Sequence, residues 1–141
     1  MIIKQAVDML VQAHKTRNPL EIIKGMNVIL VSYPLEGVRG FYQYFQRNNI
    51  IYIDEGLTDN EKLFVCAHEI GHMILHKKAN YIFMDTNTHF NTDKYENEAD
   101  CFAINLLIPD NLLIEYQEYS IEQLSRIFGY KKELIELRLQ V

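Results

Sequence analysis

The pentapeptide His-Glu-Ile-Gly-His at residues 68–72 constrains this chain more than any other stretch. It lies inside a helical pattern, and residues four apart on a helix share one face. His68 and His72 can therefore present two imidazole nitrogens to one metal ion. Glu69 lies beside the open coordination position, where it can take a proton from a metal-activated water and later give it to a leaving amine. The pattern predicts a metal site, provided that another element supplies a third ligand.

The helix that carries this pentapeptide has a marked start and a long buried side. Thr58 followed three residues later by Glu61 is a capping-box sequence, which predicts that the helix begins there. We expect the helix to run to about Leu75 or His76. Gly71 lowers helix stability, which indicates that it permits a close approach by another element.

Residues 94–109 offer the third ligand. Their apolar positions predict a second helix with one buried face, which Pro109 closes. Glu96 and Asp100 lie four apart on one face, so Glu96 can bind the metal while Asp100 accepts the second ring N–H of a ligating histidine. Glu98 competes with Glu96 as a ligand, although it does not share a face with Asp100. The alternative to a metal-binding role is that these acidic residues lie on the surface at the start of the helix and interact with the helix dipole. We favour a His-His-Glu site with one open position, as in metal-assisted peptide hydrolysis.

Other potential ligands remain open alternatives. His76 lies four residues after the second histidine of the pentapeptide and is a rival ligand, or else a surface group or a partner of the ligands. His89 lies in a polar, turn-rich connection over residues 77–92 and could approach the metal. Cys66 and Cys101 lie in helical patterns, and we expect them to be reduced thiols that pack in the core.

The motif HEIGH-x-x-x-H, followed by E-x-E-A-D-C-F-A-x-x-L-L-x-P, resembles the ImmA/IrrE family of zinc metallopeptidases. In that family the downstream helix carries E-x-x-A-[N/D]-x-F-A-x-x-L-L-x-P. The positions that match this pattern are Glu96, Ala99, Asp100, Phe102, Ala103, Leu106, Leu107 and Pro109. The resemblance extends more weakly from the first helix to the C-terminus.

Mapped residue by residue, the resemblance implies that His68, His72 and Glu96 bind a zinc ion (Zn2+) and that Glu69 is the general base. Asp100 matches the position that supports a ligand in the broader thermolysin-like zincin pattern. The residue that stabilises the oxyanion cannot be carried over. The candidates are Tyr42, Tyr44, Tyr81, Tyr95 and His89.

The remaining sequence predicts a small α+β protein of the minimal zincin-like type. Helices are expected over residues 2–16 and 19–24, and strands over 28–33, 40–46 and 49–54. We predict that the three strands form an antiparallel sheet packed on the active-site helix, with a tight turn at Arg47-Asn48-Asn49. Strand 40–46 could be an edge that pairs with an extended substrate. Its aromatic residues could instead make core contacts and cross-strand pairs.

Residues 120–139 predict two short helices separated by Gly129, with a capping box at Ser120 and Gln123. The pair superficially resembles a helix-turn-helix, but its second helix carries acidic as well as basic residues. We expect it to pack on the rest of a single domain that spans residues 1–141.

Charge and hydropathy exclude several classes of function. The net charge of −5 argues against direct binding of nucleic acid, and no apolar run is long enough to span a bilayer. The start of the chain lacks the features of a signal peptide, so we expect a cytoplasmic protein.

The resemblance implies an endopeptidase that cleaves a helix-turn-helix transcriptional repressor at a specific site and so controls a mobile element, prophage or stress regulon. One alternative is a zinc-containing module that binds and sequesters a repressor without cutting it. A second alternative is a DNA-binding regulator that acts through residues 120–139.

Overall fold

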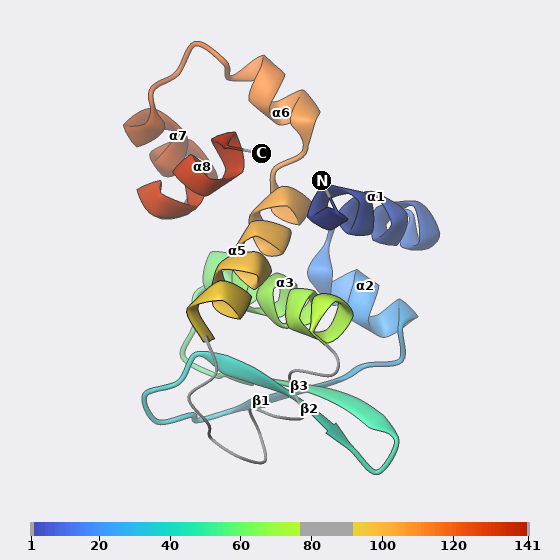
Figure 1. The fold of residues 1–141 in the computed structure, drawn as a ribbon. Helices are drawn as coiled ribbons and strands as arrows, with labels where there is room; N and C mark the ends of the chain where they lie inside the picture. The colour runs from blue at the N-terminus through green and yellow to red at the C-terminus, as the bar shows by residue number, and fades with distance from the viewer. Residues whose placement is uncertain (1, 77–91, 141) are drawn as a thin grey trace.

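The computed structural model describes residues 2–76 and 92–140, in which a small sheet packs against helices (Figure 1). In chain order the elements are α1 (Ile2–His14), α2 (Pro19–Gly25), β1 (Ile29–Tyr33), β2 (Gly40–Phe45), β3 (Asn48–Asp54), α3 (Asp59–Leu75), α5 (Thr92–Leu107), α6 (Asp110–Glu115), α7 (Ile121–Phe128) and α8 (Lys132–Leu139). The predicted α+β class is confirmed. Within the described residues, no helix combines the length and the apolar character that crossing a bilayer requires.

The sheet has the strand order β1-β3-β2, and its directions differ from the prediction. β2 pairs with β3 in antiparallel register, but β1 pairs with β3 in parallel register, with Ile29 opposite Ile50. The sheet is therefore mixed, and the prediction of a wholly antiparallel sheet is wrong for β1. β3 lies between β2 and β1, so among the described residues β2 is an edge strand, which the predicted pairing with an extended substrate requires.

The turn between β2 and β3 lies one residue earlier than predicted. Gln46 and Arg47 both have positive φ angles, 50° and 66°, and Phe45 pairs with Asn48 directly after them. Two consecutive residues of positive φ form the two-residue hairpin turn whose twist matches that of the strands. Asn48 and Asn49, which were predicted to lie in the turn, are the first residues of β3.

Helix α3 lies between the sheet and α5 at the centre of the fold (Figure 1). Ile51 and Ile53 of β3 belong to the same buried cluster as Phe64 of α3, because alternate residues of a strand face one side. On the opposite side, a Cβ built on Gly71 would lie 3.1 Å from the Cβ of Phe102 in α5. The prediction that Gly71 permits a close approach is confirmed, and this contact sets the spacing of the two helices that carry the candidate site.

The C-terminal helices have a core of their own that continues onto α5. Ile104 of α5 and Ile108, which directly follows α5, pack with Leu124 of α7 and Ile135 of α8. Gly129, with a φ of 80°, ends α7 as the sequence predicted. The assignment of residues 120–139 to the same domain stays a prediction, and this packing supports it.

Candidate metal centre

Helix α3 positions three histidines in a row. Its start is fixed by the predicted capping box, in which Thr58 accepts from the Glu61 backbone N–H and the Glu61 carboxylate accepts from the Thr58 backbone N–H. His68 and His72 lie one turn apart on the side that faces α5, and His76 follows at the end of the helix. Both His72 and His76 are buried.

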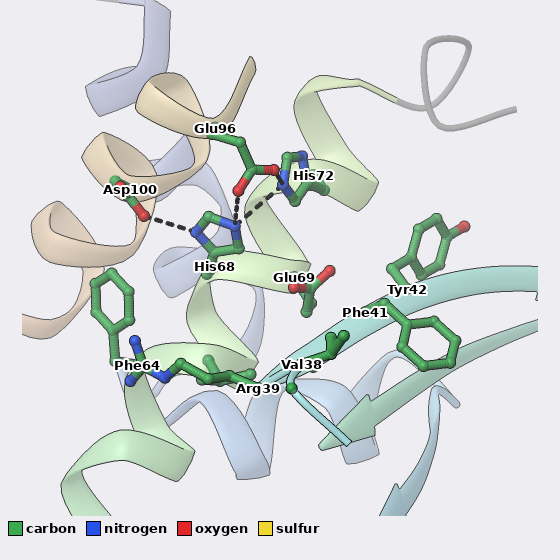
Figure 2. Close-up of a pocket in the computed structure, with 13 residues that line it drawn as sticks. Val38, Arg39, Phe41, Tyr42, Phe64, His68, Glu69, His72, Glu96 and Asp100 are labelled. Atoms are coloured by element: carbon green, nitrogen blue, oxygen red, sulfur yellow. Dashed lines mark hydrogen bonds and ion pairs between the residues drawn. The ribbon is translucent and has the colours of Figure 1, made fainter. Parts of the chain in front are cut away.

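The donor atoms of His68, His72 and Glu96 converge on one point (Figure 2). His68 Nε2 lies 3.2 Å from one carboxylate oxygen of Glu96, and His72 Nε2 lies 2.7 Å from the other. The two Nε2 atoms are themselves 3.1 Å apart. All three donor atoms lie within 4.8 Å of one another.

Asp100 completes the arrangement from the next turn of α5. Its Oδ1 lies 2.8 Å from His68 Nδ1, so the ring donates its Nδ1–H to the carboxylate. In a neutral ring this leaves the Nε2 of His68 with a free electron pair directed at His72 and Glu96. Two nitrogens and a carboxylate that face one another in this way form a donor set that fits a divalent metal ion.

The electrostatics of the donor group favour a positive charge at its centre. Burial alone would lower the pKa of His68, but the hydrogen bonds with Asp100 and Glu96 and the charge of Glu69 raise it to about 10. Hydrogen bonds from His68 and His72 hold the pKa of Glu96 well below its ordinary value. The carboxylates therefore favour a positive charge beside the rings, which agrees with the proposed metal site.

Glu69 lies next to the donor group on the side that faces the sheet (Figure 2). Its side chain is buried, and burial raises the pKa of its carboxyl group, while the neighbouring His68 and His72 oppose that rise. A carboxylate held here is placed to exchange a proton with a group bound at the metal. Its role as the general base stays a prediction, as do the three assigned ligands.

The two rival ligands contact each other instead of joining the donor group. His76 Nε2 lies 2.8 Å from Glu98 Oε1, and His76 Nδ1 lies 3.1 Å from His72 Nδ1. Burial lowers the pKa of His76, and the hydrogen bond with Glu98 opposes this shift. The ring of Tyr95 packs edge-on against His76 with centroids 4.6 Å apart.

A pocket of about 530 Å³ opens in front of the donor group. One wall is α3, with Phe64, Val65, His68, Glu69 and His72, and Glu96 and Asp100 of α5 border it. The opposite wall consists of residues 37–42, which include the first residues of β2. The edge strand and the candidate metal site therefore face the same space.

Of the described candidates for oxyanion stabilisation, Tyr42 alone lines this pocket. Its hydroxyl donates to Asn49 Oδ1 at 2.6 Å, and burial raises its pKa. Tyr44 is exposed on β2, and Tyr95 packs against His76. The two remaining candidates, Tyr81 and His89, lie outside the described residues.

Two features of the site were missed in the sequence. Val38 and Arg39 line the pocket from a segment without a recognisable motif, so no sequence signal pointed to them. The contact between His76 and Glu98 was also missed, although a signal existed. Histidines at positions i, i+4 and i+8 of one helix continue along the same face, so each could meet a partner from the facing helix.

The two cysteines take no part in the donor group. Cys66 and Cys101 are free thiols in the buried core, as expected from their patterns. Burial raises the pKa of Cys66 to about 12, which keeps it a neutral thiol at physiological pH.

Comparison with known proteins places these observations in a family. Residues 23–140 match the family described as the IrrE N-terminal-like domain, peptidase family M78. The chain is 39% identical over 140 residues to immunity region protein 2 of Bacillus phage phi105, covering 97% of this chain and 89% of that protein. It is 29% identical over 143 residues to metallopeptidase ImmA of Bacillus subtilis strain 168, covering 97% of this chain and 83% of that protein.

A solved structure shares the fold at greater evolutionary distance. A Mycobacterium tuberculosis transcriptional regulator superposes with a TM-score of 0.67 at 14% identity. The match covers 99% of this chain but 46% of the regulator, so it supports the fold alone. From the match over residues 23–140 and the two relatives, we conclude that this chain belongs to the ImmA/IrrE family, a family of metallopeptidases.

Proposed function

We propose that this chain is a zinc-dependent endopeptidase that cleaves a helix-turn-helix transcriptional repressor at a specific bond. The observation that carries the proposal is the convergence of His68, His72 and Glu96 on one point, with Glu69 buried beside them at the wall of a pocket. A site that only stabilised the fold would need no carboxylate next to the donor group and no opening in front of it.

The three ligands would hold zinc through two ring nitrogens and one carboxylate, which is a donor set typical of catalytic zinc. Zinc supplies Lewis acidity, which polarises a peptide carbonyl and lowers the pKa of a water to about 7. Glu96 and the two histidines orient the reacting groups, and Asp100 fixes the ring of His68.

Glu69 carries out the proton transfers in this proposal. Its carboxylate accepts a proton from the attacking water and then donates it to the nitrogen of the leaving amine, so that one proton acceptor serves both halves of the reaction. Because this side chain of α3 is buried, it is held in position before the substrate arrives.

The pocket supports an extended peptide as the substrate. Within the described part of the chain, β2 pairs with β3 and leaves its other edge without a strand. Gly40, Phe41 and Tyr42 of β2 line the pocket beside Glu69. An extended peptide laid along this edge would add a strand to the sheet and bring its carbonyl groups to the metal. The phage relative named for an immunity region supports a repressor as the protein that supplies this peptide.

The decisive experiment is mass spectrometry of a candidate repressor, the one encoded nearest to the gene of this chain, after incubation with the zinc-loaded protein. The same incubation is run with Glu69→Gln and, as a matched control, with Glu55→Gln, which alters an exposed carboxylate away from the pocket. One discrete cut that Glu55→Gln retains and Glu69→Gln loses would establish the endopeptidase.

The same samples separate the proposal from sequestration. If the repressor stays intact and forms an equally stable complex with the wild type and with Glu69→Gln, the chain is a binding module and the peptidase proposal is wrong. Titration with duplex DNA completes the comparison, because a salt-dependent gel shift would favour the DNA-binding alternative.

A further inference from the structure

The third histidine of α3 is buried and bonded on both sides, although it lies outside the donor group. His76 Nδ1 lies 3.1 Å from Nδ1 of His72, and its Nε2 lies 2.8 Å from Glu98 Oε1. Its side chain is 3% exposed, against 35% for Glu98. A series of hydrogen bonds thus connects a partly exposed carboxylate, that of Glu98, to the buried ring of His76 and then to Nδ1 of His72, a candidate metal ligand.

The position of each hydrogen in this hydrogen-bond series can be assigned by starting from the proposed metal ligand, His72, and from the carboxylate of Glu98. A histidine that binds a metal through Nε2 carries its hydrogen on Nδ1, so His72 must find an acceptor for its Nδ1–H. The atom that faces it is Nδ1 of His76, which accepts only when His76 carries its own hydrogen on Nε2. Glu98 accepts that Nε2–H. Every hydrogen then has an acceptor, with both rings neutral and the carboxylate ionised.

We propose that His76 and Glu98 are positioning residues that fix the tautomer and the orientation of His72 as a metal ligand. The inference rests on the proposed metal site. Glu98 holds the hydrogen of His76 on Nε2, and His76 in turn holds the hydrogen of His72 on Nδ1. The Nε2 electron pair of His72 is thereby directed to the metal.

The proposal gives the two histidine ligands different supports from the same helix. His68 donates directly to Asp100, whereas His72 donates to His76, which lies between it and Glu98. Helix α5 therefore supplies the third ligand, Glu96, and both supporting carboxylates, Asp100 for His68 and Glu98 for His72 through His76. A support of this kind typically contributes 10- to 100-fold to metal affinity.

The first test measures zinc affinity by competition with a chelator. His76→Phe keeps a ring of similar size but removes the acceptor, and it should weaken binding by about 10- to 100-fold. His76→Asn places an amide oxygen near the position of Nδ1, so it should restore most of the lost affinity. His14→Phe, the same change at the end of α1, should bind zinc like the wild type.

A second pair of variants tests the outer carboxylate. Glu98→Gln should fall between the wild type and His76→Phe, because an amide can either accept from His76 or donate to it. Asp93→Asn removes a charge from an exposed position near the start of the same helix and should leave affinity unchanged.

The third test observes the tautomers directly in the folded wild type, so it does not depend on any variant. NMR of the ¹⁵N-histidine-labelled, zinc-loaded protein should show a hydrogen on Nδ1 of His72 and on Nε2 of His76, with coupling across the hydrogen bond between the two Nδ1 atoms. A hydrogen on Nδ1 of His76, or zinc bound to His76, would overturn the proposal.

The outcomes distinguish this inference from the proposed function. Equal zinc affinity in the wild type and His76→Phe would refute the positioning role while leaving the peptidase intact. A wild type that binds no zinc would refute the metal site, and this inference with it. Repressor cleavage is not used as a readout, so failure to cleave would count against the proposed function alone.

Discussion

The helices that carry the candidate metal centre and the C-terminal helices both bury polar side chains, but these side chains have different hydrogen-bond partners. Glu69 and His72 of α3 and His76 directly after it are buried, and the two histidines bond to each other and to carboxylates of α5. In α8, Arg138 is equally buried, but its guanidinium donates to the Ile108 carbonyl and to Asp110.

This difference separates a site from a structural contact. Arg138 bonds a backbone carbonyl and a carboxylate of the segment that follows α5, so that side chain serves packing and helix connection. His68 and His72 instead direct their Nε2 atoms at a point shared with Glu96, where a cation or a proton would complete the arrangement. We therefore expect metal and catalytic mutations to affect the first region and leave the second unchanged.

The largest expected effect is that of Glu69→Gln on cleavage. Loss of the proton acceptor should lower the rate by about 10²- to 10⁴-fold, which corresponds to about 3 to 5 kcal/mol of activation free energy. The free energy of unfolding of the metal-free protein should not fall, since a buried carboxyl group with a raised pKa is replaced by a neutral amide. Cleavage assays and denaturant unfolding measure the two quantities. A large loss of stability would mean that Glu69 is a structural residue.

Zinc should stabilise the first region by mass action. At a free concentration 100 times the dissociation constant, binding adds about 2.7 kcal/mol to the free energy of unfolding. Thermal unfolding with and without zinc should show this gain in the wild type and in Arg138→Met, but only a small part of it in Glu96→Gln. An undiminished gain in Glu96→Gln would remove Glu96 from the ligands.

Arg138→Met should destabilise the C-terminal helices without altering zinc affinity. The buried carbonyl of Ile108 loses its donor, which costs about 1 to 3 kcal/mol. Lys4→Met is the matched control, because Lys4 bonds the same Asp110 from an exposed position and such pairs contribute about 1 kcal/mol or less. Denaturant unfolding tests the difference. If the two substitutions lowered the free energy of unfolding equally, the burial of Arg138 would add nothing to its contribution to stability.

Gly71→Ala should act on the contact between α3 and α5. The added Cβ would lie 3.1 to 3.2 Å from Phe102, which is fully buried. Overpacking costs about 1 to 3 kcal/mol, and the gain in helix propensity returns about 1 kcal/mol. A net loss of about 1 kcal/mol is therefore expected from thermal unfolding. Phe102→Leu in the same chain should recover part of it, whereas a more stable Gly71→Ala would show that the helices adjust freely.

The smallest effect is the pH dependence at Asp110. The hydrogen bonds from Lys4 and then Arg138 lower its pKa below the ordinary value of 3.8. A carboxyl group whose pKa is lower in the folded state stabilises the protein above the unfolded value, and this contribution disappears as the pH falls through the folded value.

Because Asp110 is largely exposed, we expect about 1 kcal/mol or less at pH 7. The difference in unfolding free energy between the wild type and Asp110→Asn should therefore be largely retained from pH 7 to about 4 and should shrink as the pH falls below 3.8. If this difference in unfolding free energy stayed constant as the pH fell below 3.8, the charge of Asp110 would not be its cause.

The parts of the site that depend on one helix could be predicted, and those that depend on several elements could not. The spacing of His68 and His72, and of Glu96 and Asp100, fixes which side chains share a face, so each of these two pairs followed from the geometry of a single helix. The contact between His76 and Glu98 depends on how α3 and α5 cross, and helix periodicity does not specify that angle.

The sheet shows the same limit. Alternating apolar residues identify a strand in either direction, so the parallel pairing of β1 with β3 left no trace in the sequence. The turn was placed one residue late because Gln46 and Arg47 are unusual residues at positive φ, where Asn and Gly are the usual signals.

The contact of Gly71 with Phe102 also decides how this protein would respond to a shortage of metal. His72 and Glu96 lie 24 residues apart, so a metal bound to both acts as a cross-link that closes a loop of that length. In small zinc modules such closure depends on the metal, and the chain unfolds without it. Here apolar packing between the two helices has already closed the loop. If the proposed site binds a metal, we therefore expect the chain to keep its fold when the metal is lost, so that metal supply would govern activity without marking the chain for degradation.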